Sequence, residues 1–168
     1  MSTTQPQISQ EDFRRTVGRF TTGVTVVTTC SEGTLHGMTA NSFASLSLDP
    51  LLVLICVDRA ARMHDLLDVN GMFAVTVLAA DQTDASVWFA SPSRPSGTDQ
   101  FDGFDWRPGP VTGCPFLTGG VAWLDCRVTA AHDGGDHTIF VAEVLGLGEG
   151  GGVEPLVWHA GGYRRLAS

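Results

Sequence analysis

The fold is decided by the stretch Thr22-Gly23-Val24-Thr25-Val26-Val27-Thr28-Thr29, which consists almost entirely of valine and threonine. Side chains that branch at Cβ pack well on a pleated sheet, so this stretch predicts a β-strand. Four later segments are also short, apolar or β-branched, and turn residues separate them. They are Leu51–Val57, Met72–Leu78, Val121–Ala130 and Thr138–Leu147. The chain is therefore predicted to be mainly β.

Helical patterns are fewer and shorter than strand patterns. Apolar residues recur at i, i+4 and i+7 from Phe13 to Phe20, and Ser9 with Asp12 three residues later resembles a capping box. These signals predict one amphipathic helix over about residues 10–20. Two further short helices are expected between strands, at His64–Val69 and at Asp81–Phe89, the second with Asp81 as its cap.

Length and element order indicate the architecture. A chain of 168 residues corresponds to one domain, expected over residues 1–168, since a domain has roughly 150 residues. We expect residues 1–9 to be disordered, and closely spaced prolines predict an irregular loop over residues 91–113. Because strands outnumber crossover helices, the pattern favours a mainly β antiparallel barrel with a few helices over a doubly wound parallel sheet.

Charge and composition exclude several classes of protein. The net charge is −8, and all ten Lys plus Arg residues are arginine. The absence of lysine excludes Schiff-base chemistry with pyridoxal phosphate and the phosphate-binding loop that requires Gly-Lys-Ser/Thr. An acidic chain also lacks the clustered basic surface that duplex nucleic acid or an anionic membrane attracts, so we expect neither partner.

The sequence shows no sign of secretion or membrane insertion. Residues Met1–Gln10 lack a basic start followed by an apolar segment, and the longest apolar run, Leu51–Val57, is shorter than the roughly 18 residues that span a bilayer. The four cysteines form no Cys-x-x-Cys pair and are expected to be reduced. We therefore expect a cytoplasmic protein.

Two motifs formally match a cofactor or metal site. Gly146-Leu147-Gly148-Glu149-Gly150-Gly151 fits the dinucleotide pattern G-x-G-x-x-G, but the following segment contains Pro155 and no helix signal, which favours a hairpin connection. Two histidines and two aspartates lie within residues 132–137, around a Gly-Gly turn. They could ligate a metal, yet nothing nearby completes a site, so we expect no metal.

Two segments have the composition of a binding site. Gly37-Met38-Thr39-Ala40-Asn41-Ser42-Phe43-Ala44-Ser45-Leu46-Ser47 suits either a solvated loop or a strand whose edge admits a flat ligand, with hydrogen bonds donated by its hydroxyl and amide side chains. Asp58-Arg59-Ala60-Ala61-Arg62-Met63-His64 places two arginines at a helix start, where they oppose the helix dipole. This second segment fits a phosphate site and ordinary surface charge equally well.

Taken in order, these segments resemble the short-chain NAD(P)H:flavin oxidoreductase family, the reductase components of two-component flavin-dependent monooxygenases. The resemblance extends over nearly the whole chain, from Phe13 to Leu166. Its most specific parts are Gly37–Phe43 with Ser45–Pro50, and Gly135-Asp136-His137-Thr138. The fold that this resemblance implies is the flavin-binding split barrel, a Greek-key antiparallel β-barrel.

The resemblance also implies which residues bind the two nucleotides. One segment would line the flavin ring and tail, a second would hold the phosphate region, and a third would close over the flavin. In that order they comprise Met38, Thr39, Ala40, Asn41, Ser42, Ser45 and Leu46; Val57, Asp58, Arg59, Arg62, Met63 and His64; and Phe89 and Ala90. The nicotinamide nucleotide would contact Asp136 and His137, with Tyr163 as a further candidate.

The implied function is hydride transfer from NADH or NADPH to FMN or FAD, with the reduced flavin supplied to a separate monooxygenase. Because the cofactors carry the bond-making chemistry, no catalytic side chain is expected. A homodimer with flavin near the subunit interface is implied by analogy. Three alternatives stay open: a non-catalytic flavin carrier, a flavoenzyme that reduces another acceptor such as a cobalamin or a ferric complex, and a split-barrel protein that binds another cofactor.

Overall fold

The computed structural model describes residues 7–166. The predicted disorder of residues 1–9 therefore lies mostly outside the described residues, and within them Ser9 is the N-cap of the first helix. None of the helices in residues 7–166 combines the length and the apolar character that a membrane crossing requires.

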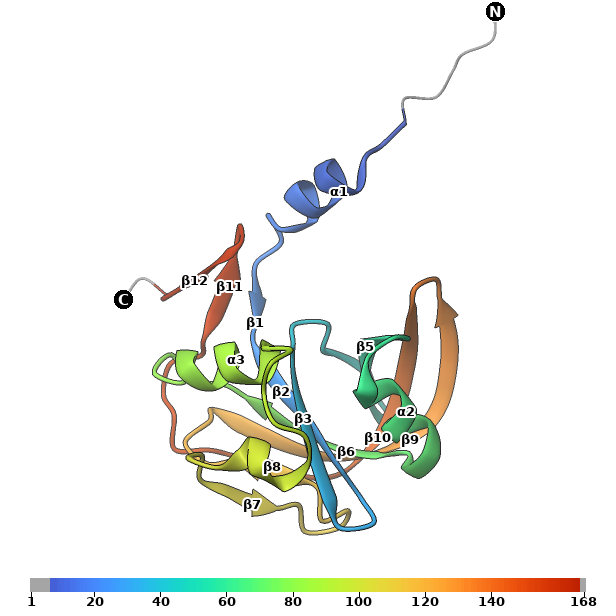
Figure 1. Ribbon diagram of the computed structural model, residues 1–168, viewed down its shortest axis with the longest axis vertical. Coiled ribbons are helices and arrows are strands. Elements are labelled where there is room, and N and C mark those ends of the chain that lie inside the picture. The colour runs from blue at the N-terminus through green and yellow to red at the C-terminus, as the bar shows by residue number, and fades with distance from the viewer. Residues whose placement is uncertain (1–6, 167–168) are drawn as a thin grey trace, which may run out of the picture.

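Twelve strands and four short helices make up the described chain (Figure 1). The α-helices are α1 (Gln10–Val17), α2 (Arg62–Asn70) and α3 (Thr83–Ala90), and η1 (Gly97–Phe101) is a 3-10 helix. The strands are β1 (Thr22–Gly23), β2 (Thr25–Ser31), β3 (Thr34–Ala40), β4 (Ala44–Leu48), β5 (Leu51–Asp58), β6 (Met72–Val77), β7 (Trp106–Pro108), β8 (Pro115–Leu117), β9 (Ala122–Gly134), β10 (His137–Glu149), β11 (Val157–His159) and β12 (Gly162–Arg164).

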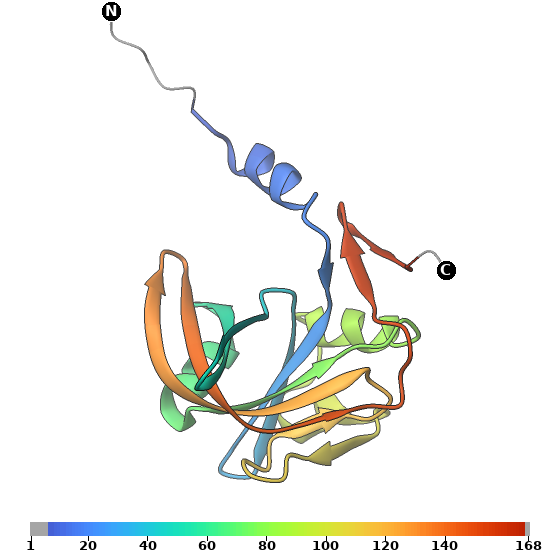
Figure 2. The ribbon, with the colours of Figure 1, turned by 180° about the vertical axis from the view of Figure 1, so that it is seen from behind.

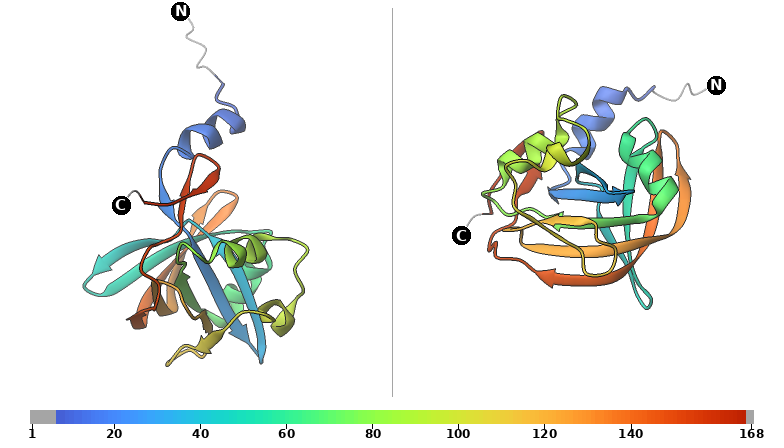
Figure 3. Two further views of the ribbon diagram at one scale, coloured as in Figure 1. Left: turned by 90° about the vertical axis from the view of Figure 1, so that its left-hand side faces the viewer. Right: turned by 60° about the horizontal axis from the view of Figure 1, so that its bottom comes forward.

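A seven-stranded sheet in the order β3-β2-β6-β9-β10-β5-β4 forms the body of the molecule, and every neighbouring pair in it is antiparallel. The sheet curls on itself, as the right-hand view of Figure 3 shows. Its edge strands β3 and β4 follow one another in sequence but do not pair, so the barrel is split along that line. The predicted fold class, a mainly β antiparallel barrel with few helices, is confirmed.

Several element boundaries differ from the sequence-based predictions. The first helix ends at Val17 instead of residue 20, because glycine follows at position 18 and no residue of the helix is buried. The predicted strand at 22–29 is broken at Val24, whose N–H bonds to Leu156 O (3.1 Å) and whose carbonyl accepts from Leu78 N (3.0 Å). Val24 thus carries the chain from one sheet to the next.

Two other predictions need correction. The cap of α3 is Gln82 instead of Asp81, and the Gln82 side chain bonds to Ala79 N (3.0 Å) and Thr118 O (2.8 Å). The segment 91–113 is not wholly irregular, because it contains η1 and β7. Its apolar residue Phe101 is only 3% exposed, and burial of that ring supplies the order that the prolines do not suggest.

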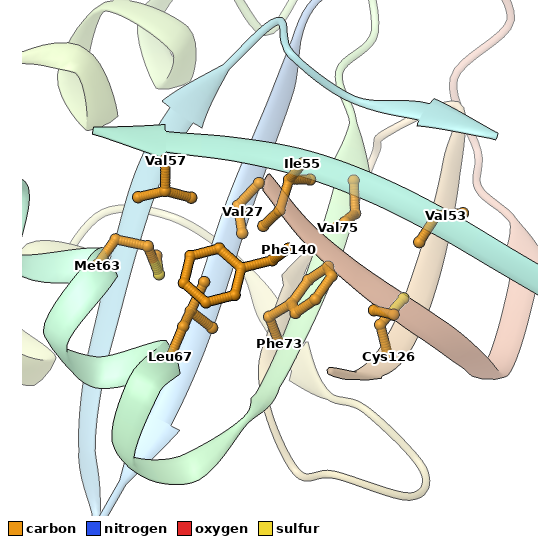
Figure 4. Close-up of a cluster of buried hydrophobic side chains, with 11 residues drawn as sticks. Val27, Val53, Ile55, Val57, Met63, Leu67, Phe73, Val75, Cys126 and Phe140 are labelled. Atoms are coloured by element: carbon orange, nitrogen blue, oxygen red, sulfur yellow. The ribbon is translucent and has the colours of Figure 1, made fainter. Parts of the chain in front are cut away.

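The main core lies inside the curl of the sheet (Figure 4). Phe140 on β10, Phe73 on β6 and Ile55 on β5 are fully buried there. Met63 and Leu67 of α2 point into the same cluster and lie beside Phe140. Each such side chain contributes about 1.5–3 kcal/mol on burial, so α2 is fixed firmly enough to present its first turn to a ligand.

The free edge of β3 is covered by two side chains instead of a strand. Gln100, which is 0% exposed, accepts a hydrogen bond from Gly37 N (2.8 Å) and donates one to Leu35 O (3.1 Å). Arg94 donates to Gly37 O (2.9 Å). Unpaired strand groups are costly when buried, so these contacts fix the position of β3 beside the split.

Candidate active site

Three pockets that share lining residues lie along Thr39–Asn41, at the end of β3 and the turn that follows it, and together they are called the trough. The first has a volume of about 790 Å³ and the second about 260 Å³, and both are lined by Thr39 and Ala90. The third, of about 530 Å³, shares Asn41 and Trp158 with the second. We refer to these as the charged, aromatic and outer pockets of the trough.

The charged pocket concentrates positive groups in a chain of net charge −8. It is lined by Arg62, Arg94 and His36 together with Asp58. His36 is 6% exposed, and burial together with the nearby Arg94 and Arg62 lowers its pKa from 6.5 to about 4. Burial also lowers the pKa of Arg94, whose buried Nε has no partner among the described residues. The pocket is therefore suited to an anion, which would compensate the partly desolvated guanidinium of Arg94.

Backbone geometry shapes the rim of this pocket. Asp58 Oδ1 accepts from Ala60 N (2.8 Å) and its carbonyl accepts from Ala61 N (3.0 Å), which folds the chain between β5 and α2 into a tight turn. Ala61, the N-cap of α2, provides no side-chain hydrogen bond to the first turn. The N-terminal N–H groups of α2 thus lack a side-chain cap where the helix dipole favours negative charge.

The aromatic pocket is narrower and less polar. It is lined by Trp158 of β11 and Tyr163 of β12, whose rings pack edge to face with centroids 5.0 Å apart. Tyr163 OH and Ser86 Oγ form a hydrogen bond of 2.8 Å, which ties the β11–β12 hairpin to α3. Val24, Ala40 and Ala90 line it as well, together with the polar residues Thr39, Asn41 and Ser86. The pocket thus combines apolar faces with a few hydrogen-bonding groups, as sites for flat ring systems do.

The outer pocket lies between α1 and the turn that joins β3 to β4. Phe13 and Val17 of α1 line it, together with Asn41 and Phe43. Phe13 is 61% exposed and Phe20 is 75% exposed. α1 extends away from the sheet in Figures 1 and 2, so this apolar surface has no cover from the described chain itself.

A corner beside the charged pocket holds the predicted nicotinamide contact. His137 on β10 pairs with Asp58 on β5, and Arg59 N donates to Asp136 O (3.0 Å), which binds the two turns together. His137 Nδ1 lies 2.8 Å from Asp136 Oδ1, and this bond lowers the pKa of the Asp136 carboxyl. In this arrangement His137 Nδ1 carries the hydrogen and donates it to the Asp136 carboxylate, so Nε2 is left for a bond to a ligand.

Most of the predicted site residues meet in the trough. The lining includes Met38, Thr39, Ala40, Asn41, Ser42, Asp58, Arg62, Phe89, Ala90 and Tyr163. The others do not line it: Ser45 and Leu46 are exposed on β4, Val57 and Met63 are in the core, and Arg59, His64, Asp136 and His137 lie around it. Another pocket, lined by Arg107, Trp123 and Glu149 among others, contains none of the predicted residues.

Several expected hydrogen-bond donors are already used within the protein. The Thr39 hydroxyl donates to Ser86 O (2.7 Å), and the Ser42 hydroxyl donates to Cys56 O (2.9 Å). His64 Nε2 bonds to Thr138 Oγ1 (2.8 Å) and joins α2 to β10. These side chains hold the walls of the trough, which corrects the expectation that Thr39 and Ser42 donate to a ligand.

Arg59 also differs from its expected role. Its guanidinium lies 3.3 Å from Asp133 Oδ1 on the β9–β10 hairpin, outside the lining of the charged pocket. Arg62 is the arginine of this segment that lines the pocket. The structure therefore favours Arg62 over Arg59 for contact with an anion.

Sequence reasoning missed several residues of the trough, among them the charged or aromatic side chains of His36, Arg94 and Trp158. His36 lies one residue before the quoted segment Gly37–Ser47. Because side chains alternate between the two faces of a strand, His36 shares a face with Met38 and could have been found from that pattern. Arg94 lies in the segment expected to be an irregular loop, and Trp158 belongs to a three-residue strand that carries no periodic signal. Only the three-dimensional structure brings these residues together.

The antiparallel barrel, split between β3 and β4, has the architecture of the flavin-binding split-barrel class that the sequence resemblance implies. A family model described as "Flavin reductase like domain" matches residues 17–167. This chain therefore belongs to the flavin reductase family, and the resemblance found in the sequence is confirmed.

Named relatives agree with this assignment. An NADH-dependent FAD reductase of Streptomyces globisporus is 48% identical over 155 residues, which cover 92% of this chain and 85% of that protein. The reductase subunit HsaB of a flavin-dependent monooxygenase of Mycobacterium tuberculosis is 40% identical over 159 residues, covering 94% of this chain and 82% of HsaB. A solved structure of the NADH:FAD oxidoreductase of Streptomyces globisporus C-1027, in complex with NAD and FAD fragments, superposes with a TM-score of 0.88 at 45% identity, covering 95% of this chain and 93% of that one.

Proposed function

We propose that this protein is an NADH-dependent flavin reductase that supplies reduced FMN or FAD to a separate monooxygenase. The observation that carries the proposal is the trough, in which a cationic pocket adjoins an aromatic one beside the His137 corner. Membership of the flavin reductase family and the activities for which its relatives are named support the same reaction.

The residues present fit a flavin nucleotide. Arg62 and Arg94 supply positive charge for phosphate oxygens, and the neutral imidazole of His36 lies beside them in the same pocket. The small side chains of Ala40 and Ala90 lie beside Trp158 and Tyr163 in the aromatic pocket and leave room for a planar ring system there. Gly37 is required beneath this region, because a Cβ there would lie 2.7 Å from the Phe89 ring.

The protein's part in the proposed reaction is orientation and exclusion of water. When bound, the nicotinamide supplies a hydride and the flavin accepts it, so no side chain needs to act as nucleophile or general base. The walls fixed by Thr39, Ser42 and Tyr163 hold the ring plane, while Arg62 and Arg94 fix the phosphate end. Holding both reactants at contact distance converts a bimolecular encounter into a bound, oriented step.

The proposed function is tested by following NADH absorbance in the presence and absence of added FMN or FAD. We expect oxidation of NADH that depends on both protein and flavin. No oxidation above the free-flavin background would favour the flavin carrier. Oxidation seen only with a cobalamin or a ferric complex would favour the alternative acceptor, and no change in flavin fluorescence on titration would favour a different cofactor.

The half-buried imidazole of His137, whose Nδ1 bonds to Asp136, predicts a role in binding NADH through Nε2. We expect His137→Ala to raise the KM for NADH about tenfold, since one hydrogen bond to a bound ligand is worth about 1–1.5 kcal/mol, and to leave flavin affinity unchanged. His132→Ala on the same hairpin is the matched control, because His132 is exposed and lies outside the corner. Equal KM values for His137→Ala and the wild type would remove His137 from the site.

The charged pocket predicts discrimination between flavins with and without phosphate. Arg62→Ala is expected to weaken FMN and FAD about tenfold and to leave riboflavin binding unchanged, because only the nucleotides carry the anion. Arg59→Ala serves as the comparison, since Arg59 pairs with Asp133. Fluorescence titration with the three flavins measures both. An equal loss for riboflavin would place Arg62 against another part of the ligand.

We also propose that the protein acts as a homodimer. An eight-residue helix with no buried residue gains nothing from tertiary packing and is marginal in water, so α1 needs a partner surface. Its exposed Phe13 and Val17 line the outer pocket, so a second copy seated there would also close the trough. Sedimentation equilibrium is expected to give two chains for the wild type and one for Phe13→Glu, and a monomeric wild type would contradict the proposal.

The proposed location is the cytoplasm. The reaction consumes NADH, and all four cysteines are free thiols in the structure, which is typical of a reducing compartment.

A further inference from the structure

Two cysteines from distant parts of the chain meet near the turn of the β2–β3 hairpin. Cys30 on β2 pairs with Leu35 on β3, one residue before His36, which lines the charged pocket. Neither cysteine lines the trough. Cys30 Sγ lies 3.4 Å from Cys114 Sγ, which places the two sulfur atoms in contact. Cys30 is half-buried and Cys114 is buried.

A buried carboxylate holds the segment that carries Cys114. Asp125, which is 0% exposed, accepts from Val111 N (2.8 Å) and Thr112 N (3.1 Å), and it also accepts from the Thr112 hydroxyl. Thr112 Oγ1 in turn accepts from Cys114 N (3.1 Å). Four hydrogen bonds therefore fix the backbone next to Cys114.

The strand β2, which carries Cys30, is also bound to this segment. The Thr28 hydroxyl donates to Pro115 O, and Cys30 Sγ contacts Thr112 O at 3.6 Å. The two sulfur atoms are therefore brought together by both backbones, and their contact does not depend on long, mobile side chains. A disulfide requires an S–S distance of about 2.05 Å, so oxidation would draw the two sulfur atoms, now 3.4 Å apart, closer together by roughly 1.3 Å.

We propose that Cys30 and Cys114 form an oxidisable dithiol that hydrogen peroxide converts into an intrachain disulfide. Neither the family match nor the relatives' names assign a function to these thiols. The oxidant can be supplied externally, and one further source rests on the proposed function: reduced flavin that escapes its partner gives up two electrons to O₂ and yields hydrogen peroxide.

The chemistry balances in two steps. The sulfur of Cys30 attacks the peroxide, its S–O bond forms as the O–O bond breaks, and the products are Cys30–SOH and water. The sulfur of Cys114 then attacks the Cys30 sulfur, the S–S bond forms as the S–O bond breaks, and the hydroxide leaves with the Cys114 proton as water. Two thiols thus lose two electrons and two protons to one peroxide.

Burial sets the order of these steps. Burial raises the pKa of the Cys114 thiol to about 12, so Cys114 stays protonated and is not the first target of the oxidant. Cys30 is the more accessible of the two and meets peroxide first. The resulting bond would link β2 to the segment before β8 and so restrain the strand that pairs with β3.

The test exposes the full-length protein, without flavin, to hydrogen peroxide and counts free thiols after denaturation. The wild type is expected to fall from four free thiols to two, with a rise in Tm of roughly 5–15 °C that dithiothreitol reverses. Cys30→Ser should keep its three thiols. Cys114→Ser should form no disulfide and show no rise in Tm, and its Cys30 should accumulate as a sulfenic acid that dimedone traps. Cys56→Ser is the matched control, because Cys56 is also half-buried, and it should still lose two.

Three results would overturn the proposal: a wild type that keeps all its thiols, a Cys30→Ser variant that loses two, or a dithiothreitol-sensitive dimer in place of an intrachain bond. A second arm replaces added peroxide with NADH, FMN and air, and catalase should block oxidation there. If the disulfide forms with added peroxide but not with NADH, FMN and air, the dithiol is supported. The same result counts against the proposed flavin reduction as a source of peroxide.

Discussion

Replacing Gln100 with leucine is expected to destabilise the protein by about 3–5 kcal/mol and to weaken flavin binding at least tenfold. Gln100 is fully buried and serves in place of a neighbouring strand for β3. Leucine has a similar volume but would leave Gly37 N, Leu35 O and Gly97 O without their hydrogen bonds to this side chain. Each buried polar group that loses its partner costs about 1–3 kcal/mol. Urea denaturation measures the first effect and flavin fluorescence titration the second.

The loss of affinity follows from the position of Gly37. This residue begins the segment that lines the trough, and its backbone is held by Gln100 on one side and by Arg94 on the other. His36 Nδ1 also lies 3.4 Å from Gln100 Nε2, so the imidazole in the charged pocket loses an orienting contact in the same variant.

Gln82→Leu is the matched control for general destabilisation. Gln82 likewise bridges two backbone groups, Ala79 N and Thr118 O, but it does not line the trough. We expect Gln82→Leu to lower stability and leave flavin affinity unchanged. If both variants lose flavin affinity equally, the edge of β3 has no special role in binding.

The sequence predicted the regular part of the fold because hydrophobic periodicity is a local signal. The runs at 51–57 and 121–130 correspond to β5 and β9, and Ser9 caps α1 through a 3.0 Å hydrogen bond from Asp12 N, as its spacing indicates. The strand β3 stayed ambiguous, since its free edge is satisfied by Gln100, which lies 63 residues away from Gly37. Partners so remote leave no pattern in the strand itself.

The sequence likewise predicted only the part of the candidate site that lies in short, distinctive segments. The resemblance identified Thr39–Ser42 and Arg62, because they lie in short, distinctive segments. Arg94 and Trp158 come from a proline-rich connection and from a short hairpin, and only folding places them beside β3. Composition suggested hydroxyl donors, but it could not show that the Thr39 and Ser42 hydroxyls are already donating to neighbouring carbonyls.

The stability of the protein is expected to fall by about 3 kcal/mol between pH 6.5 and pH 4 because of His36 alone. Burial, with the charges of Arg94 and Arg62, lowers the pKa of His36 from 6.5 in the unfolded chain to about 4 in the folded one. As the pH falls from 6.5 towards 4, His36 binds a proton in the unfolded chain but stays neutral in the folded protein. The free energy of unfolding therefore decreases. Above pH 6.5 the imidazole of His36 is neutral in both states, so its titration does not lower the stability there.

The contribution of His36 is isolated by comparing urea unfolding of the wild type and His36→Gln from pH 7 to pH 4. Glutamine does not titrate, so the variant is expected to lose less stability over this range, while His132→Gln at an exposed hairpin position should follow the wild type. Saturating FMN should reduce the loss in the wild type, because a phosphate beside His36 favours its protonated form. Parallel curves for the wild type and His36→Gln would show that the imidazole is not held neutral between the two arginines.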